Sequence, residues 1–85
     1  MLNSVILTVK AEWAGIEYDI EFPANVPAGD LCARLLAVLK SIEADKFSDI
    51  DKIALIVTRS GKQLGDEETL ESAEVWDGNT VTVLK

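Results

Sequence analysis

The amino-acid sequence predicts an α+β domain in which a mixed sheet packs on one main helix. Three observations lead to this prediction. Apolar and polar residues alternate near both ends of the chain, which is typical of half-buried strands. Between these segments, apolar residues recur at the spacing of an amphipathic helix. The chain has 85 residues, of which 48% are hydrophobic and 27% charged, so we expect one globular domain over residues 1–85.

The first part of the chain predicts an antiparallel hairpin. Residues 5–12 form the first expected strand, with Val5, Leu7 and Val9 on one face. Residues 16–22, Ile-Glu-Tyr-Asp-Ile-Glu-Phe, alternate strictly and form the second. Between the two strands, Gly15 can adopt the positive φ that a hairpin turn of this length needs.

The next segment predicts the helix, over residues 27–42. Asn25 is expected as its cap, and Pro27 as a residue of its first turn. The expected apolar stripe, which needs a sheet to cover, consists of Leu31, Leu35, Val38, Leu39 and Ile42.

The second half of the chain predicts three more strands. Residues 43–52 are polar and form a connection, which Phe47 and Ile50 anchor to the core. The strands are expected at residues 53–58, 63–64 and 80–84. The order β-β-α-β-β-β, with the helix between two groups of strands, is the layout of a β-grasp domain. In this fold we expect the first and last strands to pair in parallel at the centre of the sheet.

The composition argues against several classes of function. Eight Lys and Arg residues against fifteen Asp and Glu give a net charge of −7, which argues against binding nucleic acid or an anionic membrane. Histidine is absent, and Cys32 is the single cysteine, so the usual general base, the commonest metal ligand and an internal disulfide are all lacking. We therefore expect no enzyme, no catalytic residue, no metal and no cofactor. The sequence shows no targeting signal or membrane-spanning run, so we expect a cytoplasmic protein that does not insert into a membrane.

Two groups of residues carry a family resemblance. In the second half, Gly61-Lys62-Gln63-Leu64, Thr69-Leu70, Val75 and Thr80-Val81 with Val83 resemble ubiquitin. In the first half, residues 22–27, Phe-Pro-Ala-Asn-Val-Pro, followed by Leu31 and Leu35-Leu36, resemble a narrower group. That group contains the bacterial YukD-like proteins and the ubiquitin-like domain of EccD-type membrane components of type VII secretion systems. The resemblance covers nearly the whole chain and implies an accessory role in secretion, in which the domain binds a secretion-system protein.

The sequence also departs from ubiquitin. Ubiquitin and the sulfur-carrier proteins of this fold end in a diglycine tail, whose carboxylate is activated for transfer. This sequence ends at Lys85, directly after the last expected strand, so we expect neither conjugation nor sulfur transfer. The positions that match the apolar binding patch of ubiquitin are Thr58, Thr82 and Leu84. Because two of these three carry hydroxyl groups, proteins that bind ubiquitin's patch are not expected to bind this chain.

The outer face of the expected sheet is the candidate protein-binding surface. A strip of threonine and apolar residues bordered by acidic side chains can serve for docking, although such residues are also simply good strand formers. Trp13, in the hairpin turn, is a further candidate because tryptophan is enriched at binding hot spots, and Trp76 is a weaker one. Cys32 is expected to be a packing residue, Lys62 a solvated turn residue, and residues 66–68 a solvated acidic surface. The face consists of Ile6, Thr8, Ile56, Thr58, Thr82 and Leu84, with Glu17, Asp19 and Glu21 at its border.

Three other functions remain open from the sequence. The chain can be a true modifier or sulfur carrier whose diglycine tail is missing from this sequence. It can be a small β-grasp regulatory subunit of a multicomponent oxygenase, although only the fold supports this reading. It can also be one domain of a longer EccD-like membrane protein.

Overall fold

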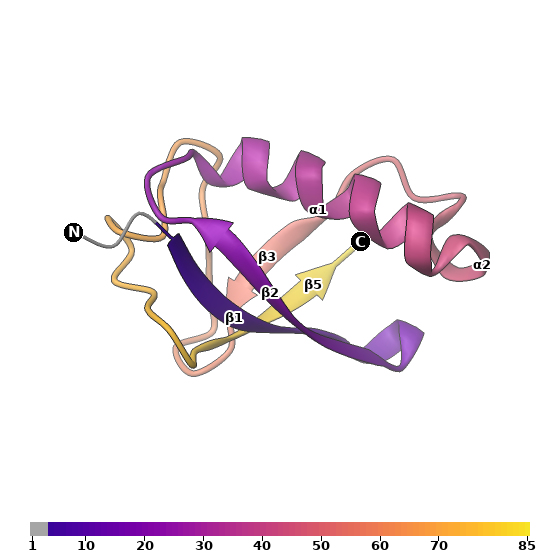
Figure 1. Ribbon diagram of the computed structural model, residues 1–85, viewed down its shortest axis with the longest axis horizontal. Helices are drawn as coiled ribbons and strands as arrows, with labels where there is room; N and C mark the ends of the chain where they lie inside the picture. Colours follow the sequence, from indigo (N-terminus) through magenta and orange to yellow (C-terminus); the bar gives the residue numbers. More distant parts are fainter. Residues whose placement is uncertain (1–3) are drawn as a thin grey trace.

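A computed structural model describes residues 4–85, so the first three residues of the predicted domain lie outside the described part. It confirms the predicted α+β, β-grasp architecture: one five-stranded sheet, in the order β2-β1-β5-β3-β4, with one long helix across one face (Figure 1). The central strands β1 and β5 are parallel, as predicted, and the other pairs are antiparallel. The strands are β1 (Ser4–Ala11), β2 (Ile16–Pro23), β3 (Ala54–Val57), β4 (Lys62–Gln63) and β5 (Thr80–Leu84). The helices are α1 (Ala28–Ile42), the short α2 (Ala44–Phe47) and the 3-10 turn η1 (Glu12–Ala14).

The core lies between α1 and the inner face of the sheet. It is entirely apolar, since no polar or charged residue is buried among residues 4–85. The inner sides of the two central strands and one side of α1 supply most of it. Burial of this apolar surface is the main stabilising contribution to the fold. Its central members are Val5, Leu7, Val9, Val81 and Val83 of the sheet and Leu31, Leu35 and Leu39 of the helix.

The buried side of α1 differs from the predicted stripe. Ala28 and Leu36 are buried in addition to Leu31, Leu35 and Leu39. By contrast, Val38 and Ile42 are 46% and 49% exposed. Residues at 28, 31, 35, 36 and 39 lie within one arc of the helix, whereas Val38 lies on its flank and Ile42 is its last residue. The sheet covers only that arc. None of the described helices is long and apolar enough to cross a membrane.

The start of α1 also differs from the prediction. Pro27 is the N-cap residue rather than a first-turn residue, and no side chain caps the helix. The first two N–H groups of the helix instead donate to backbone carbonyls of a distant loop: Ala28 N to Glu68 O at 2.6 Å, and Gly29 N to Asp66 O at 2.9 Å. The loop at 65–72 thus satisfies donors that helix starts leave unpaired. The predicted cap at Asn25 is wrong because these carbonyls take its place.

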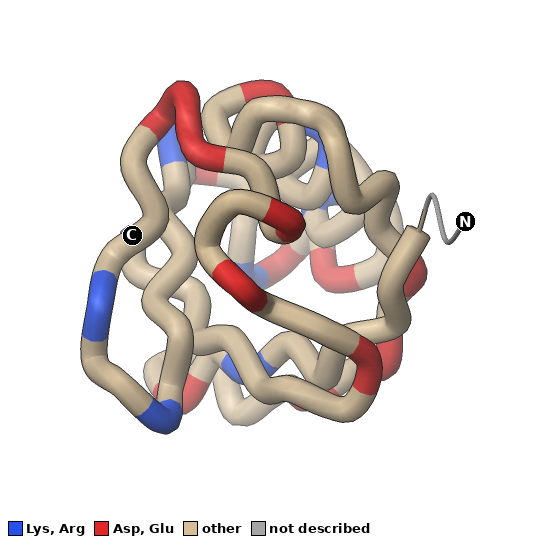
Figure 2. The backbone as a smooth tube through the Cα atoms, turned by 90° about the vertical axis from the view of Figure 1, so that its left-hand side faces the viewer, with Lys and Arg blue, Asp and Glu red and all other residues tan. Residues whose placement is uncertain are grey.

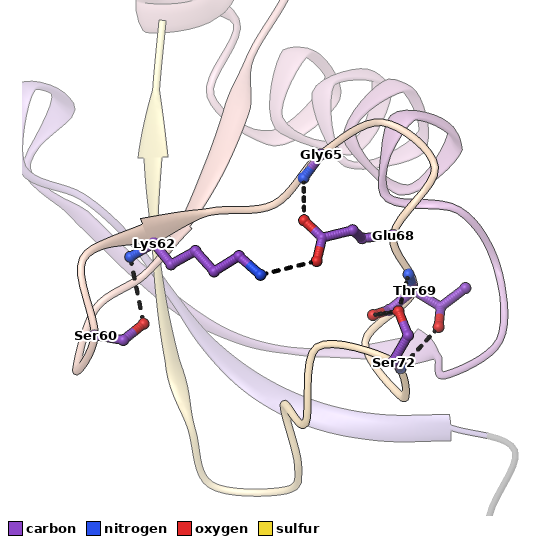
Figure 3. Close-up of polar contacts among 6 residues, drawn as sticks. All are labelled: Ser60, Lys62, Gly65, Glu68, Thr69 and Ser72. Carbon is purple, nitrogen blue, oxygen red and sulfur yellow. Dashed lines mark hydrogen bonds and ion pairs between the residues drawn. The ribbon is translucent and has the colours of Figure 1, made fainter.

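This capping loop is held in shape by Glu68 (Figure 3). One carboxylate oxygen of Glu68 accepts a hydrogen bond from Gly65 N at 2.7 Å, and the other pairs with Lys62 Nζ at 3.1 Å. Thr69 and Ser72 close the next turn, where the hydroxyl of Thr69 accepts from Ser72 N at 3.0 Å. Lys62 and Glu68 were expected to be solvated surface residues. Lys62 is exposed as predicted, but it is also ion-paired with the partly buried Glu68 because the loop folds back beside β4.

Candidate functional site

The structure places all six candidate side chains of the sheet on its outer face, opposite α1. The register of the strands sets their positions. Thr8 pairs with Thr80 across the parallel β1–β5 ladder, and Thr82 pairs with Ile56 across β3–β5. Thr58 follows β3, and its hydroxyl lies 2.8 Å from that of Thr82. The face therefore has a row of threonines across its middle.

The apolar residues of this face form two separate groups. Leu84 pairs with Ala54, and Ile56 is its diagonal neighbour, so these three residues lie together at one end of the face. Ile6 lies at the other end, where its carbonyl accepts a hydrogen bond from Gly78 N at 3.0 Å. Ile6 is 53% exposed and Leu84 is 38% exposed. We define the Ile56 cluster as Ala54, Ile56 and Leu84, three neighbouring apolar residues, whereas Ile6 stands alone.

Acidic side chains border the face along β2. Glu17 forms an exposed ion pair with Lys10, with Nζ and Oε1 3.6 Å apart. Asp19 accepts a hydrogen bond only from the hydroxyl of Thr8, at 2.9 Å, and Glu21 only from that of Ser4, at 2.6 Å, among the bonds made by residues 4–85. The negative charge of this border is therefore mostly uncompensated. Acidic positions are also spread over the loops at one end of the molecule (Figure 2).

Trp13 lies at the end of the sheet and on the helix side, away from the outer face. Its ring packs on Phe47 of α2, with centroids 5.0 Å apart and planes tilted by 59°. Its indole N–H donates to Val83 O at 3.0 Å, and Lys85 Nζ lies 4.8 Å from the ring centroid. These contacts give Trp13 a role in the fold, yet 37% of the residue stays exposed. The structure does not bring Trp13 together with the six residues of the sheet face.

Cys32 lies beside a groove of about 350 Å³ between α1 and residues 51–53. Burial raises the pKa of its thiol, and the negative charge of Asp66 raises it further. The thiol is therefore protonated at neutral pH, which suits the predicted packing role rather than a nucleophile. Within residues 4–85, no three acidic or cysteine side chains are grouped to hold a metal ion.

A second groove was missed by the sequence reasoning. It has a volume of about 210 Å³ and lies between β2 and the exposed flank of α1. Ile20 and Phe22 line it from the strand, and Val38 lines it from the helix. The residue in the sequence that could have pointed to this groove is Val38. It lies at the margin of the apolar stripe of the helix, where a side chain is found between the core and the surface.

Comparisons with known proteins agree with the fold described above. The family described as "WXG100 protein secretion system (Wss), protein YukD" matches residues 5–83. No curated protein matches the chain in sequence. The ubiquitin-like domain of EccD5 from Mycobacterium xenopi is similar in structure, with a TM-score of 0.77, 17% identity, and coverage of 95% of this chain and 92% of that chain.

Two further solved structures are similar. The ubiquitin-like domain of the Mycobacterium tuberculosis type VII secretion system protein ECCD1 has a TM-score of 0.75 and 20% identity, covering 99% of this chain and 100% of that chain. A chain of the MycP5-free ESX-5 inner membrane complex has a TM-score of 0.79 and 21% identity, covering 98% of this chain but 21% of that chain. At these identities the likeness establishes the ubiquitin-like fold.

Proposed function

The chain belongs to the YukD family of the WXG100 protein secretion system, and from this membership we propose that it is an accessory component of a type VII secretion system that binds another protein of that system. The similarity to EccD ubiquitin-like domains supports this role. We place the protein in the cytoplasm, without insertion into the membrane. Docking needs no catalytic group, so the proposal does not include an enzymatic activity.

The observation that carries the binding proposal is the outer face of the sheet. It presents the partly exposed Ile56 cluster and a row of threonines on a hydrogen-bonded sheet, which binds without reordering its backbone. The hydroxyls of Thr58 and Thr82 bond to one another, so a partner can contact their methyl groups without leaving these hydroxyls unpaired. Preorganisation of this kind lowers the entropic cost of association.

The proposed contact residues follow from this arrangement. The centre consists of Ile56, Leu84, Thr58 and Thr82, and the surface extends across the sheet to Thr8 and Ile6. The acidic border along β2 favours a partner with Lys or Arg around an apolar contact, since complementary charge steers association. Trp13 lies outside this set of contacts, and its exposed edge at the end of the sheet is proposed as a separate contact.

The test is a binding measurement with the secretion-system proteins encoded beside this gene in its own genome. Ile6, Ile56 and Leu84 are replaced together by Asp in the full chain, and folding is checked by circular dichroism. We expect affinity to fall at least about tenfold, because even one of these apolar side chains contributes about 1.5–3 kcal/mol when it is fully buried in the contact. The control is Ile42→Asp, the same kind of change at an exposed helix position. Unchanged affinity in the folded triple variant would refute the proposed face.

A second candidate is that this domain acts as part of a longer EccD-like protein. The match in which it covers 21% of a chain of the ESX-5 inner membrane complex favours this candidate. Sequencing the coding region around the domain tests it. A reading frame that continues into apolar spans would support it, and a stop codon after Lys85 would exclude it.

A further inference from the structure

The groove between β2 and α1 combines an apolar floor with an open sheet edge. Its apolar lining comes from both elements, Ile20 and Phe22 of β2 and Leu31, Leu35 and Val38 of α1, and its charged lining residues are Glu21 of β2 and Arg34 of α1. One end is bounded by Pro23, the last residue of β2. Toward the other end, the Tyr18 hydroxyl donates to Glu43 Oε2 at 2.7 Å and joins the strand to the end of the helix. The groove therefore lies along the second half of β2.

The backbone of β2 is free on the side next to this groove. Gly78 N donates to Ile6 O and Thr8 N donates to Asn79 O, so the peptide groups of Ile6 and Thr8 point toward β5. Peptide groups alternate in direction along a strand, so Val5, Leu7 and Val9 point toward β2. Their partners in the register are Phe22, Ile20 and Tyr18.

It follows that the peptide groups of Glu17, Asp19 and Glu21 point away from the sheet. Within residues 4–85, β2 pairs only with β1 and is the outermost strand. At eight residues, β2 is far longer than β4, the two-residue strand at the opposite edge. A long edge strand with unpaired N–H and C=O groups is a template for pairing with another strand.

Charge determines which strand fits. The side chains of Glu17, Asp19 and Glu21 are all exposed on the outer face, beside the edge. Pairing of β2 with β2 of a second copy would bring two such acidic rows onto one face, which is unfavourable. An added strand alternates its side chains between two faces, one toward the groove and one toward these acids. The matching sequence therefore has apolar residues at alternate positions, with Lys or Arg between them.

We propose that the groove between β2 and α1 binds an extended segment of a partner protein, in which apolar and basic residues alternate, as an added strand on β2. The apolar residues enter the groove beside Ile20 and Val38, and the basic residues lie beside Asp19 and Glu21. The apolar parts of the two sites are separate, Val38 in the groove and Ile56 on the outer sheet face, and the sites share only the acidic border along β2, so changes at Val38 and Ile56 distinguish them.

The test uses the full chain and a synthetic peptide of eight residues in which Val and Lys alternate. A peptide of the same composition with all Val residues first is the control for alternation. Binding is followed by the amide signals in NMR spectra. We expect the alternating peptide to move the amide signals of Glu17, Asp19 and Glu21 more than those of Ile56 and Thr82. Equal binding of the two peptides, or shifts confined to the outer face, would overturn the proposal.

Variants of the chain test the apolar contact and the charge contact of this site separately. Val38→Asp, at an exposed position, is expected to weaken binding about tenfold. Asp19→Lys is expected to weaken it as well, by an amount that shrinks as salt is added. Ile56→Asp, on the other surface, should leave peptide affinity unchanged. Unchanged affinity in both groove variants would refute the site, and a dimer paired through β2 in sedimentation experiments would refute the assigned occupant.

Discussion

Replacement of Phe47 by alanine is expected to lower the free energy of unfolding by about 3–5 kcal/mol. Phe47 is fully buried in α2 and packs on the ring of Trp13, 5.0 Å away between centroids. Loss of the ring removes a burial contribution of about 2–3 kcal/mol and leaves a cavity. The surroundings cannot close it fully, because Trp13 is also held by its hydrogen bond to Val83 O. Domains of this length have total stabilities of about 4–13 kcal/mol, so the variant is expected to be close to unfolding.

The measurement is urea unfolding followed by circular dichroism, because Trp13 fluorescence changes when its neighbour is removed. Phe47→Leu, which keeps most of the volume, serves as the control and should cost less than about 1.5 kcal/mol. A double-mutant cycle with Trp13→Leu should give a coupling energy of about 0.5–1.5 kcal/mol for the ring pair. A loss below about 1 kcal/mol in the alanine variant would show that α2 does not pack into the core as described.

Three further predictions concern the loops and the groove. The hydrogen bond from Gly65 N and the ion pair with Lys62 hold the pKa of Glu68 below its ordinary value of 4.5. The Glu68 carboxylate therefore stabilises the fold above pH 4.5. This contribution is lost as the pH falls through the lowered pKa. Glu68→Gln should therefore flatten the dependence of thermal stability on pH in this acidic range, and an unchanged pH dependence in this variant would contradict the role given to Glu68. Tyr18→Phe should raise the pKa of Glu43, because the Tyr18 hydroxyl is the largest cause of its lowered value, and an NMR titration that shows no rise would contradict this assignment. Gly78→Ala should cost about 1–2 kcal/mol in urea unfolding, because Gly78 has a φ of 86° and other residues are strained there.

The sequence predicted the sheet well because alternation is a local property. The side chains of residues 5–9 and 80–84 point inward or outward as their period of two requires, and burial agrees with it. The start and flank of α1 were predicted less well. The start depends on the loop at 65–72, which is distant in the sequence, and the flank depends on how β2 lies beside the helix. Phe47 was recognised as an anchor, but its short helix was not, because four residues give no periodicity.

For the candidate sites too, local patterns were predictable from the sequence and contacts between distant segments were not. Alternation assigned Ile6, Ile56 and Leu84 to one face, but only the register of β3 on β5 separates Ile6 from the other two. The β2–α1 groove was not predicted, because it requires knowing that β2 is an edge strand and how α1 lies above it. Trp13 was assigned from residue type alone. Its contacts with Phe47 and Val83 depend on elements that meet only in the folded chain.

The parallel pairing of β1 with β5 has a consequence for biosynthesis. The two central strands come from residues 4–11 and 80–84, so the first strand of this domain must find its last strand. Until residues 80–84 leave the ribosome, the nascent hairpin carries an unpaired inner edge and an uncovered apolar side. Such distant pairing slows folding and exposes incomplete chains to aggregation. We therefore expect the domain to acquire its native structure only after translation has passed residues 80–84.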